Sequence, residues 1–172
     1  AGKDGRSPNG LSLPSPGGLG VRLGEGPGVR AIWVKRSKRG PMDPRDTAEL
    51  VAAKGIVGNA NRRGRRQVVL LAEEGWADAI AEVGSPVDPS KRRANLLVSG
   101  VNFEGTRGRT LRVGGCRLRI WMECTPCERM DEAHPGLQKA LRPHWRGGAC
   151  AEIVEGGEIR LGDPIAWEEA GS

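Results

Sequence analysis

The most regular pattern along the chain lies between residues 116 and 123, where apolar and polar side chains alternate. The apolar set consists of Cys116, Leu118, Ile120 and Met122. Such alternation predicts a strand with one face buried and the other exposed. Gly114 and Gly115 precede this strand and predict a tight turn to a second strand over residues 110–113.

Several shorter patterns predict the remaining elements. The apolar runs at residues 31–34, 67–72, 94–98 and 165–167 predict strands. The three-and-four spacing of apolar residues over 73–83 predicts a helix. Residues 149–154 and 158–161 flank Gly156 and Gly157 and predict a second hairpin. Short strands, glycine turns and few helices together predict a mainly β fold, a β-barrel with a few short helices.

The first 28 residues differ in composition from the rest of the chain. They contain nine Gly and four Pro with only scattered apolar residues. Such a segment buries too little surface to offset its ordering entropy, so we expect residues 1–28 to form a flexible tail. A chain of 172 residues suits one compact domain. Residues 29–172 are therefore predicted to form a single domain.

Positive charge is concentrated in the first part of this domain. Residues 29–66 hold eleven Lys or Arg against three Asp or Glu, whereas from residue 67 onward thirteen face sixteen. The cluster around Arg65 and Arg66 suits an anionic partner, such as nucleic acid, a membrane surface or a phosphorylated small molecule, and a solvated loop explains it equally well. The single Phe, the lack of Tyr and the lack of a reader motif argue against nucleic acid.

The chain shows no sign of a membrane or secretory segment. Its longest apolar run, residues 68–72, is far too short to cross a bilayer. No basic stretch followed by an apolar region occurs near the start, so we expect a cytoplasmic protein with no membrane partner.

Four cysteines are present, and two of them form a Cys-Thr-Pro-Cys motif directly after the alternating strand. Continued alternation predicts that Cys124 points inward, Thr125 outward and Pro126 inward, with Cys127 beyond them as an accessible thiol on a loop. A thiol there suits a sulfur carrier, a metal ligand or a redox centre. A zinc site, a thioredoxin-like motif and two small buried residues are the alternatives.

A longer ordered series of short motifs runs through the chain. It consists of Gly58-Asn59-Ala60, Gly64-Arg65-Arg66-Gln67, Arg92-Arg93-Ala94-Asn95, Thr125-Pro126-Cys127, Trp145-Arg146-Gly147-Gly148 and Gly162-Asp163-Pro164. In this order the series resembles the MOSC family, which occurs at the C-terminus of molybdenum cofactor sulfurases and also alone in bacteria. The resemblance covers residues 29–168.

The resemblance implies a MOSC-type β-barrel that binds the molybdenum cofactor (molybdopterin) or relays sulfur to it. The family's characteristic cysteine falls on Cys127, as a molybdenum ligand or a sulfur carrier. An Arg-x-Asn pair that borders the cofactor in amidoxime-reducing relatives falls on Arg93 and Asn95. Gly162-Asp163-Pro164 is taken as structural.

The chemistry of a pterin phosphate agrees with this assignment. Guanidinium groups bind phosphate, so Arg65, Arg66, Arg92 and Arg93 are candidates for that contact. Amide side chains read the edges of a heterocycle, which suits Gln67 and Asn95. Thr125, two residues before Cys127, completes the set of candidate cofactor-binding residues.

The function predicted from these features is a cofactor-binding or sulfur-carrier domain that serves the maturation or activity of molybdoenzymes. Its expected partners are a molybdoenzyme, an electron-transfer protein or a cysteine desulfurase, and pyridoxal phosphate enters only through that separate desulfurase. The alternatives are a molybdenum-dependent reductase of N-hydroxylated compounds and a basic nucleic-acid-binding module. Asn59 stands where many relatives have Asp.

Overall fold

The computed structural model of the chain describes residues 26–61 and 64–169. Residues 1–25, which make up most of the expected tail, lie outside the described residues. The last residue of that expected tail, Gly28, already belongs to the first strand.

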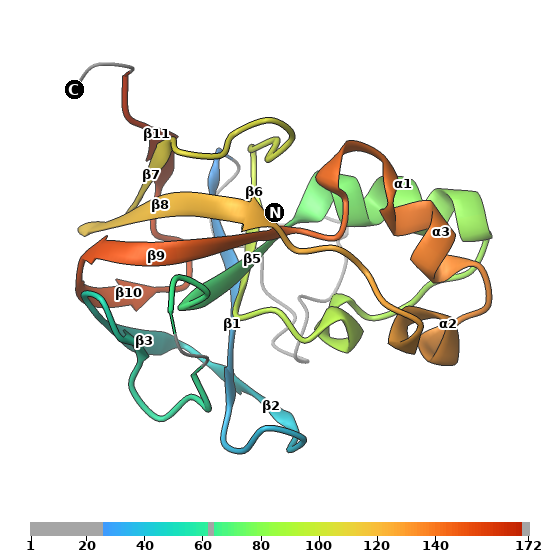
Figure 1. Ribbon diagram of the computed structural model, residues 1–172, viewed down its shortest axis with the longest axis horizontal. Coiled ribbons are helices and arrows are strands. Elements are labelled where there is room, and N and C mark those ends of the chain that lie inside the picture. The colour runs from blue at the N-terminus through green and yellow to red at the C-terminus, as the bar shows by residue number, and fades with distance from the viewer. Residues whose placement is uncertain (1–25, 62–63, 170–172) are drawn as a thin grey trace, which may run out of the picture.

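Most of the strands belong to one mixed sheet of eight (Figure 1). They are β1 (Gly28–Lys35), β2 (Met42–Arg45), β5 (Val68–Ala72), β6 (Leu96–Ser99), β7 (Thr110–Val113), β8 (Cys116–Glu123), β9 (Ala149–Glu155) and β11 (Ile165–Trp167). Their order is β11-β7-β8-β9-β5-β6-β1-β2, and β5 and β6 are the one parallel pair among them. A smaller sheet joins β10 (Gly157–Arg160), β3 (Thr47–Val51) and β4 (Gly55–Ile56).

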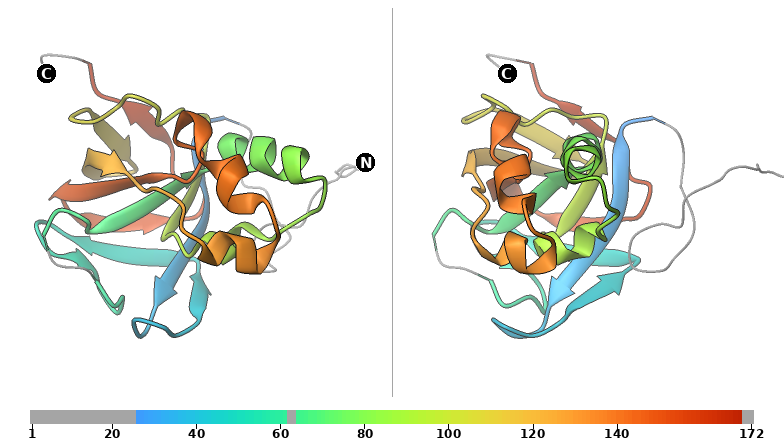
Figure 2. Two further views of the ribbon diagram at one scale, coloured as in Figure 1. Left: turned by 45° about the vertical axis from the view of Figure 1, so that its right-hand side comes forward. Right: turned by 90° about the vertical axis from the view of Figure 1, so that its right-hand side faces the viewer.

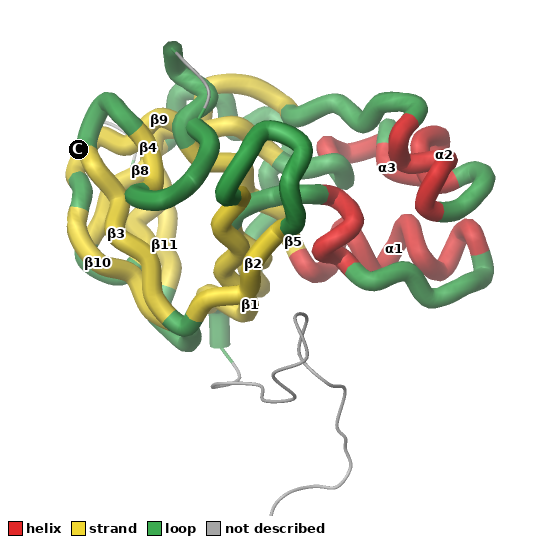
Figure 3. Tube along the Cα trace, turned by 90° about the horizontal axis from the view of Figure 1, so that it is seen from below, coloured by secondary structure: helices red, strands yellow, loops and turns green. Residues whose placement is uncertain are grey.

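The helices are few and short. They are α1 (Glu73–Val83), α2 (Arg129–Ala133) and α3 (Leu137–Leu141), with 3-10 turns η2 (Pro89–Arg92) and η3 (Pro143–Trp145). All three α-helices gather on one side of the large sheet, as the turned views show (Figure 2). From below, the helices and the bulk of the strands lie at opposite ends of the molecule (Figure 3).

The mainly β class with a few helices is therefore confirmed, but a closed barrel is not found. Strands β11 and β2 end the large sheet, and no pairing among the described strands joins them to each other. Among the described residues, no helix has both the length and the apolar character needed to span a bilayer.

Two apolar clusters hold the fold together. One lies between the sheets and includes Leu70, Leu96 and Leu118. The other joins the outer face of the large sheet to the helices and includes Trp33, Trp76 and Leu137. Strands β1, β5 and β6 are thus covered on both faces, which explains why their sequences are nearly continuous apolar runs.

Strand β8 keeps its predicted bounds but not its full alternation. Cys116, Leu118 and Ile120 are buried as expected, whereas Met122 is 41% exposed. The pairing with β9 shifts register between Ile120 and Met122, because a bulge there inserts an unpaired residue. The expectation that Met122 shares the buried face is wrong for this reason.

The second predicted hairpin is also wrong. Strands β9 and β10 follow each other in sequence, but β10 pairs with β3 in the other sheet. The chain crosses between the sheets at Gly156, where a Cβ atom would collide with the carbonyl of Leu50. Glycine at this position permits the crossover between the sheets. The Gly156-Gly157 pair therefore marks a crossover and not the hairpin turn that it predicted.

Candidate functional site

The Cys-Thr-Pro-Cys segment leaves the sheet where β8 ends. The amide of Cys124 still donates to the carbonyl of Gly148, at 2.8 Å, so the segment starts beside the beginning of β9. Cys124 and Pro126 are buried while Thr125 and Cys127 are exposed. The predicted burial of Cys124 and Pro126 and exposure of Thr125 and Cys127 are therefore confirmed, although the bulge in β8 breaks the alternation that suggested them.

Arg92 binds the backbone of this segment through its buried side chain. It is the last residue of the 3-10 turn η2. Asp88 caps the start of this turn, and its side chain accepts a hydrogen bond from the amide of Ser90 at 2.8 Å. The Arg92 side chain is only 9% exposed. Its guanidinium donates to the carbonyl of Gly147 at 2.7 Å and to that of Cys124 at 2.8 Å.

The same guanidinium also reaches the next peptide and the thiol. Arg92 Nη2 lies 3.3 Å from the carbonyl oxygen of Thr125 and 3.3 Å from Cys124 Sγ. One buried cation thus binds two consecutive carbonyls and a sulfur atom. Charge-assisted bonds of this kind are about twice as strong as neutral ones, so the segment that leads to Cys127 is held firmly.

A second cysteine and a second arginine complete the group around Cys124. Cys150, in β9, is fully buried, and its sulfur accepts from Arg66 Nε at 3.4 Å. Arg66 Nη2 lies 3.9 Å from Cys124 Sγ. Cys124, Cys150, Arg66 and Arg92 are called the thiol cluster below.

The cluster shifts the pKa values of its two cysteines in opposite directions. A hydrogen bond from Cys150 and the charges of Arg92 and Arg66 lower the pKa of Cys124 to about 5. The bond donated to Cys124 and burial raise the pKa of Cys150. Burial and the neighbouring Cys124 also raise the pKa of Glu123. At neutral pH, Cys124 is therefore a thiolate that accepts the Cys150 proton as a hydrogen bond.

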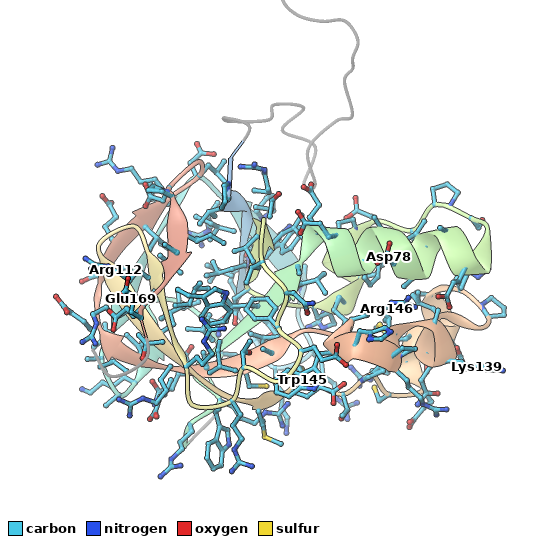
Figure 4. The ribbon with its side chains drawn as sticks, turned by 90° about the horizontal axis from the view of Figure 1, so that it is seen from above. Asp78, Arg112, Lys139, Trp145, Arg146 and Glu169 are labelled. Carbon is cyan, nitrogen blue, oxygen red and sulfur yellow. The ribbon has the colours of Figure 1, made fainter. Side chains whose placement is uncertain are left out.

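The connection between α3 and β9 also contributes to the site and has an unusual backbone conformation. His144 and Trp145 have φ values of 58° and 55°, a backbone region that costs free energy for residues other than glycine. His144 Nδ1 lies 3.1 Å from a carboxylate oxygen of Glu104. In Figure 4, Trp145 lies towards the sheet, whereas Arg146 lies beside the helices.

This turn places Gly147 against the backbone of Cys124. A Cβ atom on Gly147 would lie 2.7 Å from the carbonyl oxygen of Cys124 and 3.1 Å from Pro126 Cδ. Any larger residue would therefore push the Cys124 backbone away from Arg92. Arg146 itself serves the helical side, where it binds Glu82 at 2.6 Å and the Ala140 carbonyl at 2.9 Å.

Of the four predicted phosphate ligands, Arg65 and Arg66 lie near this site, and the Arg93 side chain points elsewhere. The fourth, Arg92, is buried and binds backbone carbonyls. The exposed Arg65 guanidinium carbon lies 4.4 Å from the centre of the Trp121 ring, and that of Arg107 lies 4.6 Å from it. Arg93 has a φ of 63° and donates to the carbonyl of Gly40 at 2.7 Å, in the turn between β1 and β2.

The two predicted amide residues are bonded within the protein. Asn95 accepts from the Val69 amide at 3.0 Å and donates to the Trp33 carbonyl and to Asn59 Oδ1. Gln67 accepts from the Ile153 amide at 2.8 Å and donates to Gly64. Both side chains are buried, so they join strands and loops of the fold.

Sequence reasoning missed the role of Cys150. No local pattern marks it, because its contact with Cys124 depends on the pairing of β8 with β9. Its position just after Gly147 and Gly148 was the available signal, since those glycines mark a close approach of chains. For the zinc alternative, no cluster of three or more metal-binding side chains occurs within residues 26–61 and 64–169.

Comparison with known proteins places the chain in a family. The MOSC domain model matches residues 43–166. No curated protein matches the chain significantly in sequence. The fold is similar to that of YuaD from Bacillus subtilis, with a TM-score of 0.67 and 19% identity over 81% of this chain and 93% of that chain.

Two structures of YiiM have a similar fold. YiiM from Geobacillus stearothermophilus has a TM-score of 0.66 and 16% identity over 84% of this chain and 76% of that chain. YiiM from Escherichia coli has a TM-score of 0.60 and 14% identity over 83% and 71%. The chain therefore belongs to the MOSC domain family, which is generally related to the molybdenum cofactor.

Proposed function

We propose that this chain binds the molybdenum cofactor or carries sulfur for it, and that Cys127 supplies the reactive thiol. The observation that carries this proposal is the placement of Cys127. It is the one exposed cysteine of the four, and it follows a segment whose carbonyls are bound by the buried Arg92. A reactive group held on a rigid support is preorganised for its partner.

The residues around Cys127 suit the cofactor in charge and in donor type. A thiolate is a soft ligand that molybdenum accepts. The exposed Arg65 and the half-buried Arg66 offer guanidinium groups to a phosphate. The Trp121 ring contacts the guanidinium groups of Arg65 and Arg107 and so adds a second positive charge beside Arg65.

Within this proposal the protein's residues have separate tasks. Cys127 holds the metal or the sulfur, Arg65 and Arg66 bind the phosphate, and the Thr125 hydroxyl is exposed for a hydrogen bond. Asn95 and Gln67 join strands and loops of the fold, and Arg93 binds the turn at Gly40. Bound molybdenum would supply an exchangeable sulfur or oxygen ligand and two-electron redox chemistry.

As a sulfur carrier, Cys127 needs only a persulfide donor. Its thiolate attacks the outer sulfur of the donor, the donor's sulfur–sulfur bond breaks, and the donor leaves as a thiolate. Cys127 then carries the persulfide. No oxidant is consumed, because the sulfane sulfur is only transferred.

The test is purification of the full chain from a molybdenum-replete host, with molybdenum, pterin and persulfide measured per protein. In the wild type we expect either molybdenum with pterin or a persulfide on Cys127. In Cys127→Ser we expect neither. Cys116→Ala is the matched control, because it removes a buried thiol at the other end of β8. Equal retention in Cys127→Ser and the wild type would overturn the assignment of Cys127, and absence of both from the wild type would overturn the function.

A further inference from the structure

The two cysteines of the thiol cluster have no task in the proposed function, yet the cluster places their sulfur atoms near each other. Both contact one guanidinium, with Arg66 Nε 3.4 Å from Cys150 Sγ and Arg66 Nη2 3.9 Å from Cys124 Sγ. Their interaction is also the largest cause of both pKa shifts, downward for Cys124 and upward for Cys150. A thiolate beside a thiol donor is the reduced form of a dithiol pair.

We propose that Cys124 and Cys150 form a reversible disulfide when the protein meets a hydroperoxide. The site is separate from the cofactor chemistry assigned to Cys127 and does not rest on it. Cys124 is the attacking residue and Cys150 is the resolving residue.

Access and charge assign these two roles. Cys124 is 7% exposed and Cys150 is 0% exposed, so a small oxidant reaches Cys124 first. Two guanidinium groups keep Cys124 ionised, and the thiolate is the form that reacts with peroxide. Hydrogen peroxide is uncharged and small, which suits a sulfur atom in a residue that is only slightly exposed.

The reaction balances in two steps. The Cys124 thiolate attacks hydrogen peroxide, the oxygen–oxygen bond breaks, and sulfenic acid and hydroxide form. Cys150 then attacks the sulfenic sulfur, and its own thiol proton leaves with the hydroxyl as water. The two sulfur atoms together lose two electrons, which the peroxide accepts.

The strand register makes the bond strained and therefore easy to reduce. Cys150 pairs with Met122, so Cys124 lies two residues along on the neighbouring chain. Such diagonal positions are about 7–8 Å apart between Cα atoms, slightly beyond the usual span of a disulfide. Cys124 lies just past the end of β8, so forming the bond has to shift the Arg92 contacts that hold it, and strained disulfides are the labile, reversible ones.

Oxidation would also disturb the segment that ends at Cys127. The disulfide removes the negative charge that Arg92 binds, while Arg92 also holds the carbonyls of Cys124 and Thr125. An inward movement of Cys124 changes those bonds. The pair therefore couples the oxidation state of the protein to the presentation of Cys127.

The test uses the full-length Cys127→Ser variant, treated with hydrogen peroxide, blocked with a maleimide under denaturing conditions and digested with trypsin. Residues 120–129 and 147–160 form separate tryptic peptides, and the first contains both Cys124 and position 127, so the variant removes that ambiguity. We expect a cross-link between these two peptides that disappears after reduction with dithiothreitol. Cys116 is the internal control and should stay a thiol, because burial raises its pKa.

Two further variants separate the steps. In Cys150→Ala, we expect a sulfenic acid at Cys124 that dimedone traps, because the resolving thiol is gone. In Arg92→Met, oxidation of Cys124 should slow by about tenfold for each unit that its pKa rises above the assay pH. Recovery of Cys124 and Cys150 as free thiols, under conditions that oxidise the exposed Cys127 of the wild type, would overturn the proposal. A Cys124–Cys127 disulfide in the wild type with Cys150 reduced would overturn it as well.

Discussion

Replacement of Arg92 by Met removes the cation that joins the thiol cluster to the Cys-Thr-Pro-Cys segment. The guanidinium makes two short bonds to buried carbonyls, at 2.7 and 2.8 Å, and two at 3.3 Å to a carbonyl and a thiolate. Hydrogen bonds that involve a charged group contribute about 1.5–3 kcal/mol each. Counting the two short bonds alone, we expect the free energy of unfolding to fall by about 3–6 kcal/mol.

The adjacent Arg93 provides a matched control for this experiment. It is half-buried and donates one described bond, to the Gly40 carbonyl at 2.7 Å. Arg93→Met should therefore cost about 1.5–3 kcal/mol, half of the loss expected for Arg92→Met. Urea denaturation of the wild type and both variants gives the comparison, and the ultraviolet absorbance of the thiolate reports the titration of Cys124. Equal losses in the two variants, with an unchanged thiolate titration in Arg92→Met, would refute the reasoning.

Three other predictions follow from the site. Cys124 has a pKa of about 5 in the folded protein, below that of an unfolded thiol. Between those two pKa values the unfolded state binds one more proton than the folded state. The stability of the wild type relative to Cys124→Ala should therefore rise with pH there, by at most about 1.4 kcal/mol per pH unit. This advantage is lost as the pH falls through about 5, and a flat difference in urea midpoints would contradict it. Gly147→Ala should cost about 1–3 kcal/mol by calorimetry, because its Cβ would lie 2.7 Å from the Cys124 carbonyl oxygen, whereas Gly115→Ala, with open space around it, should be nearly neutral. Arg93→Ala should leave the fold intact, and since its side chain faces the turn at Gly40, cofactor retention should fall less than in Arg65→Ala; the opposite ranking would return Arg93 to the phosphate site.

Local pattern was sufficient for the elements that are defined by their own sequence. The alternation in β8 and the helical spacing in α1 predicted the bounds of both elements. The exposure of Met122 was not predictable, because the bulge depends on pairing with β9. Nor was the crossover at Gly156, which depends on the position of Leu50 in the other sheet.

The candidate site was predictable in part for the same physical reason. Alternation carried past the strand end predicted the burial of Cys124, which the structure shows even though the bulge before Met122 breaks that alternation. Alternation says nothing of the neighbours, so the pairing of Cys124 with Cys150 and two guanidinium groups was missed. A left-handed residue at the end of η2 sends Arg92 and Arg93 to different parts of the molecule, which a dipeptide cannot reveal.

Labelling of the four thiols in the native, full-length protein tests the assignment of Cys127 most directly. A bulky maleimide, applied briefly at neutral pH and followed by peptide mapping, compares access with ionisation, because Cys124 is the ionised thiol and Cys127 the exposed one. We predict that Cys127 is labelled far faster than Cys116, Cys124 or Cys150, since burial protects even an ionised sulfur from a large reagent. Faster labelling of Cys124 than of Cys127 would contradict the account.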